Sequence, residues 1–516
     1  MVKFANRAIT ALFTALLAVV LGVVLLCFAG TEFSCKRPFA LPQWAMLLIG
    51  AAVLGGLMLL VCRGRERTPK RPWLAPCLAG LALLGVQLVL CFHAYFISGW
   101  DVRNVMECAY AFAGGPCYPH AAYLSEYHNN IPIVLFFALI IRVLRFFLGN
   151  VGMDRCIYVL IALQCVLNTL TGLLAFFITQ RMTGSRRFAW GVFAVYTALI
   201  GFSPWLMVPY TDSMALFFPT AVVAVYLLKP QGWGRLLKWL GLGLLAGVGY
   251  LVKPQAIIVW IAIALIELCR AIGTGNLRRG AVRLLAMALT LGVMAGPTKQ
   301  LLIDITPANI RPHLAMNMLH YAMMGLSEKT NGIFDYDDVL ISLSADNMED
   351  RRRIQLEEIK RRLSAMTAAD MMEHLKKKTL TAYADGTFAW GCEGGFYNAQ
   401  IEDKDDVLSP FLKSVIDIEH PRFQYLLTAM HSLWLAVLLG CALCGAQRLL
   451  DREAQGLDGW NVMMLALIGL MIFEWIFEVR ARYLYLYAPY FVMLGVYGWW
   501  SVLAKFKAIK GRGRNP

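Results

Sequence analysis

The stretch that decides the fold is ITALFTALLAVVLGVVLLCFAG, from Ile9 to Gly30. It is an uncharged apolar run, and it exceeds the roughly 20 residues that a helix needs to cross about 30 Å of hydrocarbon. Further apolar runs follow at 44–62, 72–97, 156–179 and 283–302. No soluble core requires so many such segments, so the sequence predicts an all-α polytopic membrane protein.

The composition agrees with this fold class. Of the 516 residues, 59% are hydrophobic and 16% are charged, whereas a soluble protein carries about 25% charged residues. The first apolar run follows Lys3 and Arg7, as a secretory signal would, but it is longer than the roughly 7–15 residues of a signal core and lacks a clear cleavage site. We therefore expect an uncleaved anchor with its N-terminus in the cytoplasm.

The formal net charge of +15 is concentrated beside the apolar runs, in the short loops 63–71, 235–238 and 270–279 and in the tail 505–514. Basic loops stay on the cytoplasmic side of a membrane. The clusters therefore indicate topology and the lipid bilayer as partner, with no nucleic acid. The expected location is a plasma membrane crossed many times, of the bacterial inner-membrane type.

This topology divides the chain into four parts. Two N-terminal transmembrane helices are expected in 1–72, and a catalytic transmembrane core with an outer loop at 98–130 is expected in 73–302. An extracytoplasmic segment follows in 303–425. The C-terminal transmembrane helices and a basic cytoplasmic tail are expected in 426–516. The extracytoplasmic segment contains no apolar run, and its mixed pattern predicts amphipathic helices at 345–363 and 368–378.

Two neighbouring apolar segments conflict with this topology. If 131–148 and 156–179 both crossed the membrane, the basic loop 181–187 would lie outside, against the positive-inside rule. One of the two is therefore expected to be a partial or interface-lying helix that is buried against protein.

The outer loop 98–130 is the richest in polar residues. Asp101 follows a span closely, where its carboxylate can act as a general base toward an acceptor hydroxyl, help to hold a metal, or only cap a local turn. The loop ends in the string Tyr127-His128-Asn129-Asn130-Ile131-Pro132, and polar groups at a membrane boundary cost free energy unless they are paired or used. Cys108 and Cys117 are predicted either to form a disulfide or to remain free thiols.

Two polar residues interrupt the apolar core. Asp212 either caps a helix or faces the same cavity as Asp101. Lys253 either extends to the membrane interface, which we favour, or supplies a point charge to a phosphate.

Two arginines near the C-terminus, Arg480 and Arg482, point to the outer side, against the usual placement of basic residues. Guanidinium groups suit bidentate contacts with phosphate, so we favour a phosphate-binding role. The alternative is a salt bridge to Glu474 or Glu478. The acidic run 335–338 lacks the spaced oxygen ligands of a calcium loop and is expected to be solvated.

These strings, in this order, resemble the GT-C membrane glycosyltransferases, in particular the branch of protein O-mannosyltransferases and lipid A aminoarabinose transferases. The resemblance spans residues 98–489, with about 12–13 transmembrane helices and a helical outer segment expected. It is carried by short motifs at Trp100-Asp101, Tyr127 to Pro132, Tyr210-Thr211-Asp212, Lys253-Pro254-Gln255 and Glu478 to Tyr483 with Pro489. His128 departs from the family pattern, which often has proline there.

The resemblance implies an inverting transfer of a sugar from a polyprenyl-phosphate carrier to a surface polymer, lipid or protein at the outer membrane face. Asp101 would be catalytic and no cofactor or metal is expected. The expected substrate-binding residues are Tyr127, His128, Asn129, Asn130, Asp212, Lys253, His320, Glu393, Glu478, Arg480, Arg482 and Tyr483. The alternatives are a transporter or flippase of a lipid-linked sugar and a polysaccharide polymerase or ligase.

Overall fold

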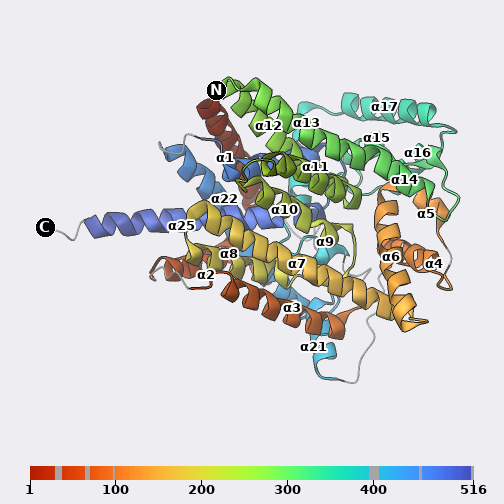
Figure 1. Ribbon diagram of the computed structural model, residues 1–516, viewed down its shortest axis with the longest axis horizontal. Helices are drawn as coiled ribbons and strands as arrows, with labels where there is room; N and C mark the ends of the chain where they lie inside the picture. The colour runs from red at the N-terminus through yellow and green to blue at the C-terminus, as the bar shows by residue number, and fades with distance from the viewer. Residues whose placement is uncertain are drawn as a thin grey trace.

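Helices make up the secondary structure of the described part of the protein, in which no strand occurs (Figure 1). The computed structural model describes residues 1–28, 38–63, 70–96, 99–117, 119–393, 406–451 and 456–512, with side chains up to residue 505. The helices are α1 Val2–Cys27, α2 Gln43–Arg63, α3 Leu74–Ala94, α4 Trp100–Phe112, α5 Ala121–Glu126, α6 Ile131–Leu148, α7 Met153–Thr183, α8 Arg186–Tyr196, α9 Thr211–Ala215, α10 Phe217–Tyr226, α11 Gly234–Val252, α12 Ile257–Thr274, α13 Leu277–Val293, α14 Lys299–Asp304, α15 Met318–Gly325, α16 Tyr336–Leu343, α17 Met348–Ala365, α18 Ala368–Tyr383, α19 Trp390–Glu393, α21 Leu408–Ile416, α22 Phe423–Leu450, α23 Gly459–Ile476, α24 Ala481–Tyr485 and α25 Ala488–Arg512.

Ten helices in the described residues are long and apolar enough to cross a membrane. They are α1, α2, α3, α6, α7, α11, α12, α13 continued through α14, α22 and α23. A shorter apolar segment, α9 with α10, lies among them (Figure 1). The predicted all-helical polytopic membrane protein is therefore confirmed, with ten candidate spans in the described residues where about 12–13 were expected.

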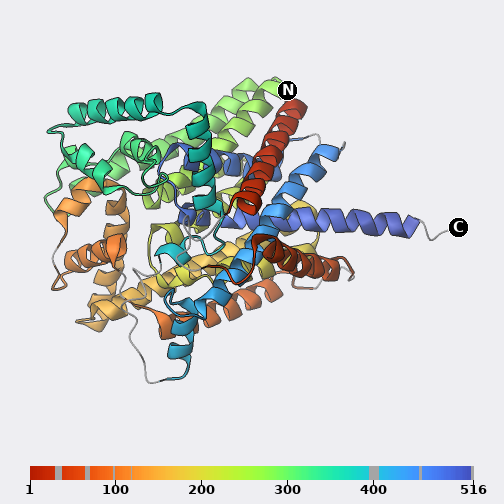
Figure 2. The same ribbon diagram turned by 180° about the vertical axis from the view of Figure 1, so that it is seen from behind.

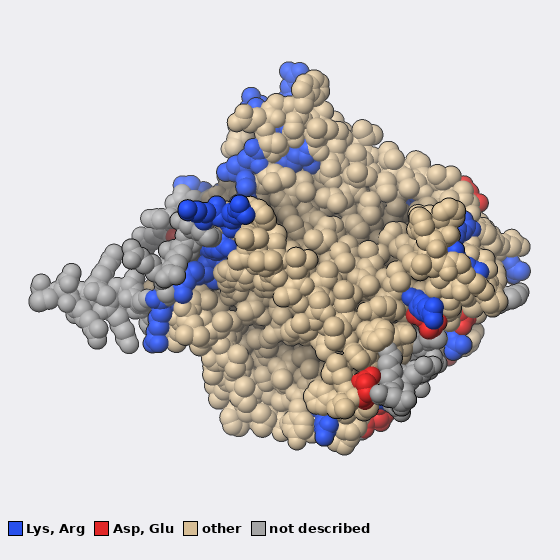
Figure 3. Space-filling view, turned by 60° about the horizontal axis from the view of Figure 1, so that its bottom comes forward, with Lys and Arg blue, Asp and Glu red and all other residues tan. Residues whose placement is uncertain are grey.

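The charged residues lie at the two ends of the molecule. Figure 3 shows a broad uncharged band between an end where Lys and Arg gather and an opposite end where acidic and basic residues mix. The basic end is also the end at which both termini lie (Figure 1). This separation is the one that a bilayer imposes on a spanning protein, because charged side chains avoid the hydrocarbon layer.

Glycines allow the central helices to approach closely. On α25, a Cβ at Gly498 would lie 1.9 Å from the carbonyl oxygen of Gly440 on α22. On α2, a Cβ at Gly50 would lie 1.9 Å from the carbonyl oxygen of Ser432, also on α22. Small residues bring helix backbones together in membranes, where packing replaces the hydrophobic effect between helices. α22 is therefore the helix against which α2 and α25 are fixed.

The helices α6 and α7 differ in direction. Both are long and apolar enough to cross a membrane, but α6 runs steeply across α7 in both ribbon views (Figures 1 and 2). α7 ends at Thr183, immediately before Arg186 and Arg187. This arrangement favours α6 as the segment that does not cross in parallel with the others.

Short helices cover the end opposite to the termini. There α14 to α17 lie beside α4, α5 and α6 (Figure 1; α17 is teal and α4 to α6 are orange in Figure 2). Both predicted helices are present, as α17 and α18, and α18 begins at a capping box formed by Thr367 and Asp370. The amphipathic pattern is not confirmed for α17, because its buried side chains are the polar Arg351 and Gln355. In this region Cys108 and Cys117 are free thiols.

Candidate active site

Asp101 lies in the first turn of α4 and contacts two tyrosines. Its helix begins after Gly99, and Asp101 does not cap it. The hydroxyl of Tyr210 donates a hydrogen bond to Asp101 Oδ2 at 3.4 Å, and the hydroxyl of Tyr123 also hydrogen bonds to this carboxyl group. The turn-capping interpretation of Asp101 is therefore wrong.

Asn130 orients both phenols. Its side-chain Nδ2 donates to the hydroxyl oxygen of Tyr123 at 2.6 Å and to that of Tyr210 at 3.4 Å. Because each phenol oxygen accepts from Asn130, its own proton is available for the carboxylate. The amide is buried, so this arrangement is fixed within the protein.

The Asp101 carboxyl group has a raised pKa. Burial is the largest cause, and the Arg482 guanidinium opposes it. The hydrogen bond from Tyr123 also lowers the pKa, the negative charge of Glu478 raises it, and the hydrogen bond from Tyr210 lowers it. A carboxylate with a raised pKa is a stronger base than an ordinary one, which suits proton removal near neutral pH.

Lys253 and Asp212 form a buried ion pair through Nζ and Oδ1. Lys253 occupies the break between α11 and the 3-10 turn Pro254–Ala256, and its Nζ lies 4.5 Å from the centroid of the Tyr483 ring. Lys253 is 7% exposed and Asp212 is 2% exposed. Lys253 therefore does not extend to the interface, and that prediction is wrong.

The interpretation of Asp212 as a helix cap is also wrong. The cap position of α9 is Tyr210, and it makes no side-chain capping hydrogen bond. The second carboxylate oxygen of Asp212 instead lies 3.9 Å from Nε of Arg482. Asp212 thus connects the lysine of one span to the C-terminal arginine.

Glu393 bridges the two C-terminal arginines. Arg482 Nη1 donates to Glu393 Oε2 at 2.7 Å, and Arg480 Nη1 donates to Oε1 at 3.0 Å. Both arginines are thus held by one carboxylate. Each guanidinium has five N–H donors and meets Glu393 through one nitrogen, Nη1.

Glu478 holds the same segment from the other side. It accepts from Arg480 Nε at 3.4 Å and from the Tyr483 hydroxyl at 3.0 Å. The predicted alternative of a salt bridge to Glu478 is therefore confirmed for Arg480. Glu474 lies elsewhere, near the Lys378 side chain and the Arg480 backbone, and it forms no salt bridge with either guanidinium.

The remaining predicted residues lie around this cluster or away from it. The ring of Tyr127 lies 5.1 Å from that of Tyr123, and Asn129 donates to Asn130 Oδ1 at 3.2 Å. His128 is near Lys299. His320 is buried in α15, where its Nδ1 lies 2.8 Å from the Ser342 hydroxyl, so the structure does not place it with Asp101.

Sequence reasoning missed Tyr123 and Lys378. Tyr123 stands four residues before Tyr127, at the spacing of one helical face. Lys378 is the last residue of the helix expected at 368–378, and its buried Nζ donates to the carbonyl oxygens of Gly325, Trp475 and Phe477 at 2.8, 3.0 and 2.7 Å. It thereby fixes the backbone directly before Glu478, and burial lowers its pKa to about 8.

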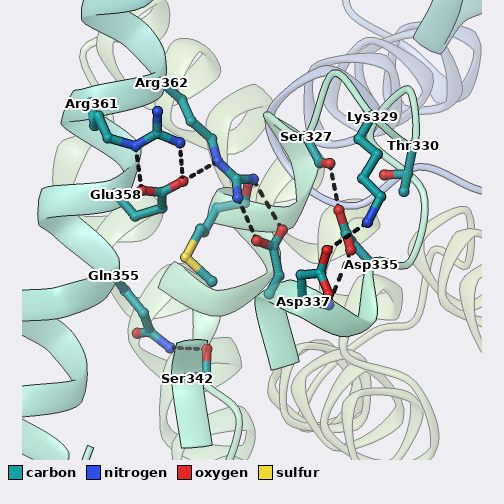
Figure 4. A network of polar contacts seen from close by, with 12 residues as sticks. Ser327, Lys329, Thr330, Asp335, Asp337, Ser342, Gln355, Glu358, Arg361 and Arg362 are labelled. Atoms are coloured by element: carbon teal, nitrogen blue, oxygen red, sulfur yellow. Dashed lines mark hydrogen bonds and ion pairs between the residues drawn. The ribbon is translucent and has the colours of Figure 1, made fainter. Parts of the chain in front are cut away.

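The acidic run 335–338 is mostly paired and partly buried (Figure 4). Asp335 accepts from the Ser327 hydroxyl at 2.8 Å, and the fully buried Asp338 pairs with Arg362 at 2.5 Å. Of the three aspartates, Asp337 alone is exposed, and it pairs with Lys329 at 2.5 Å. The prediction of a solvated cluster is therefore wrong for Asp335 and Asp338, which tie α16 to neighbouring segments.

One family model matches the chain over residues 1–502, and its description is "conserved hypothetical integral membrane protein". No curated protein and no solved structure matches the chain. The matched residues include the whole candidate site.

Proposed function

We propose, from the premise that the chain belongs to this family of conserved integral membrane proteins, that it is a glycosyltransferase. It moves a sugar from a polyprenyl-phosphate carrier to a cell-surface acceptor at the outer face of a bacterial cytoplasmic membrane. The observation that carries this proposal is the position of Arg482 beside α4: its guanidinium carbon lies 4.1 Å from the centroid of the Trp100 ring, and Trp100 directly precedes Asp101.

The reaction needs a base on one side of the sugar and positive charge on the other. The acceptor hydroxyl attacks the anomeric carbon while the bond from that carbon to the phosphate oxygen breaks. Asp101 takes the hydroxyl proton, and polyprenyl phosphate leaves with the electron pair, so the configuration inverts. The raised pKa of Asp101 supports this role.

Arg480, Arg482 and Lys253 supply the positive charge for the leaving phosphate. Preorganised charge at the leaving group is a major source of catalysis. Glu393 and Asp212 form ion pairs with these cations, so the protein itself orients them. Arginine in particular suits a bidentate contact with phosphate oxygens.

A second candidate, a transporter or flippase of a lipid-linked sugar, is supported by the Asp212–Lys253 pair. Ionisable residues buried among spans commonly mark substrate or proton pathways in transporters. The two candidates differ in one requirement. Transport needs two compartments, whereas transfer to an acceptor continues in detergent.

The test compares cells that lack the gene with cells complemented by wild type, Asp101→Asn or Glu107→Gln. Glu107 lies on the same helix as Asp101 but pairs with Arg103 and His120, so its variant is the matched control. Mass spectrometry of lipids and surface polymers is expected to show accumulated polyprenyl-phosphate sugar and a missing surface sugar in the deletion and in Asp101→Asn alone.

The same membranes, solubilised in detergent with the accumulated donor lipid, then separate the two candidates. Transfer of the sugar by wild type and Glu107→Gln but not by Asp101→Asn supports the enzyme. A deletion phenotype without any transfer in detergent supports the transporter, and an unaltered set of lipids and polymers in the deletion rejects both.

A further inference from the structure

A basic cavity lies at the end of the molecule where Lys and Arg gather (Figure 3). Its volume is about 820 Å³, and it lies between the segment after α10, the start of α11 and the start of α13. The basic residues that line it are Lys229, Arg235, Lys238, Arg278, Arg279 and Arg283. The fold thus brings two basic loops that are separate in the sequence to one cavity.

The cavity has an excess of positive charge. Among the residues that the structure describes, no Asp or Glu lines it. Arg283 pairs with Glu267 at 2.7 Å, and Lys238 donates to the carbonyl oxygens of Tyr226 and Leu228 at 2.5 and 2.9 Å. These two cations are therefore held by the protein.

The other four cations are available to a ligand. Within the described ranges, Lys229, Arg235, Arg278 and Arg279 form no ion pair, and all four are exposed. Like charges gathered at one site repel one another unless an anion binds between them. The cavity therefore favours an anionic ligand.

The surface beside the cavity is apolar. On α11 and just before it, Leu237 is 65% exposed and Trp233 is 84% exposed. On α13, Val282 is 52% exposed and Leu285 is 68% exposed. Tryptophan at the start of a span is typical of the membrane–water interface, so these side chains face lipid directly beside the basic cavity.

We infer that this cavity binds the phosphodiester head group of an anionic phospholipid, whose acyl chains lie along the exposed faces of α11 and α13. Basic pockets between transmembrane helices on the cytoplasmic side suit such head groups, and the basic loops assign this end to the cytoplasm. The apolar flank favours a lipid over a free phosphate. The inference does not depend on sugar transfer, because the cavity and Asp101 lie at opposite ends of the protein.

The test uses full-length protein purified in a neutral detergent and native mass spectrometry with phosphatidylglycerol or phosphatidylcholine. Wild type is expected to retain phosphatidylglycerol in preference to phosphatidylcholine. A variant with Arg235→Ala, Arg278→Ala and Arg279→Ala is expected to lose at least about tenfold of the bound phosphatidylglycerol, since each basic residue near an anionic lipid surface adds affinity.

The matched control removes two exposed arginines on α17, at the other end of the molecule, by Arg352→Ala and Arg353→Ala. It is expected to bind as wild type does. Equal loss in the control, or full retention by the triple variant with unchanged thermal unfolding, overturns the inference. Displacement of the lipid by millimolar glycerol 3-phosphate, which lacks acyl chains, also overturns it in favour of a soluble phosphate ligand.

Discussion

The guanidinium carbon of Arg482 lies 4.1 Å from the centroid of the Trp100 ring. This contact joins α4, which carries Asp101, to the C-terminal motif. Trp100 itself has a φ of +64°, in the left-handed region that L residues rarely adopt. Such a conformation costs about 1–3 kcal/mol and persists only where surrounding contacts enforce it, often at functional sites. The cation–ring contact is one of those contacts.

We predict that Asp101→Asn folds and inserts normally but loses at least about 100-fold of the transfer rate, in line with the loss of a general base. The amide keeps the shape of the carboxyl group and retains hydrogen-bonding capacity, but it cannot take a proton. The measurement is initial transfer rate in detergent-solubilised membranes. Wild-type transfer by this variant would remove Asp101 from the reaction.

The pH dependence of transfer is expected to shift in opposite directions in two charge variants. A base acts only when it is deprotonated, so the rate falls as the pH drops through the raised pKa of Asp101. Arg482 lowers this pKa and Glu478 raises it. Arg482→Gln should therefore move the acid limb to higher pH, and Glu478→Gln should move it to lower pH.

The measurement is the pH–rate profile of kcat for wild type and both variants. The position of the acid limb is compared, and not its height, because either variant also changes the binding of the donor. Shifts in the same direction would show that a group other than Asp101 controls the limb.

The sequence predicted the spans well because a helix in lipid needs its own long apolar run. The run at 9–30 and the basic loops each carry this information locally. The direction of α6, in contrast, could not be predicted from its own residues. Its residues are as apolar as those of a crossing helix, and only its packing beside α4 and across α7 sets its direction.

The residues of the site were predicted better than the pairs that they form. Asp101, Lys253 and Arg482 each stood out as a polar group in an apolar context, which a sequence displays directly. Asp212 and Glu393 were predicted as members of the site too, but their pairing with Lys253 and Arg482 was not, because each pair joins residues that are far apart in the sequence. For the same reason Asp338 was expected to be solvated, since Arg362 reaches it from another helix.

The Asp212–Lys253 pair is expected to stabilise the transmembrane core only as a pair. Lys253→Met leaves a buried carboxylate whose nearest remaining cation is Arg482, at 3.9 Å. Removal of one partner of a buried ion pair costs about 3–5 kcal/mol, whereas removal of both costs much less. The melting temperature should therefore fall further in Lys253→Met than in Lys253→Met with Asp212→Asn. The single variant Asp212→Asn completes the comparison. If the losses of the two single variants add up to the loss of the double variant, the two residues do not interact.

Two adjacent arginines on α17, Arg361 and Arg362, differ in their exposure and in their partners (Figure 4). Both bind Glu358, but Arg361 has a side chain that is 68% exposed, whereas Arg362 is 14% exposed and reaches the fully buried Asp338. We expect Arg361→Met to lower the free energy of unfolding by less than about 1 kcal/mol, because exposed ion pairs contribute little to stability. Arg362→Met should lower the free energy of unfolding by about 3–5 kcal/mol, because Asp338 is left as a buried, uncompensated charge.

The defect of Arg362→Met should also depend on pH. Burial raises the pKa of Asp338 in the folded protein, and Arg362 opposes this rise, so loss of Arg362 raises the pKa further. The folded state of the variant then favours the protonated carboxyl group, and its penalty is full at neutral pH and shrinks as the pH falls through that raised pKa toward the ordinary value of about 3.9. Thermal unfolding at a series of pH values measures this, with Arg361→Met as the control. A defect of Arg362→Met that stays constant on acidification, or that Asp338→Asn does not partly relieve, would show that the arginine stabilises α17 by packing rather than by charge.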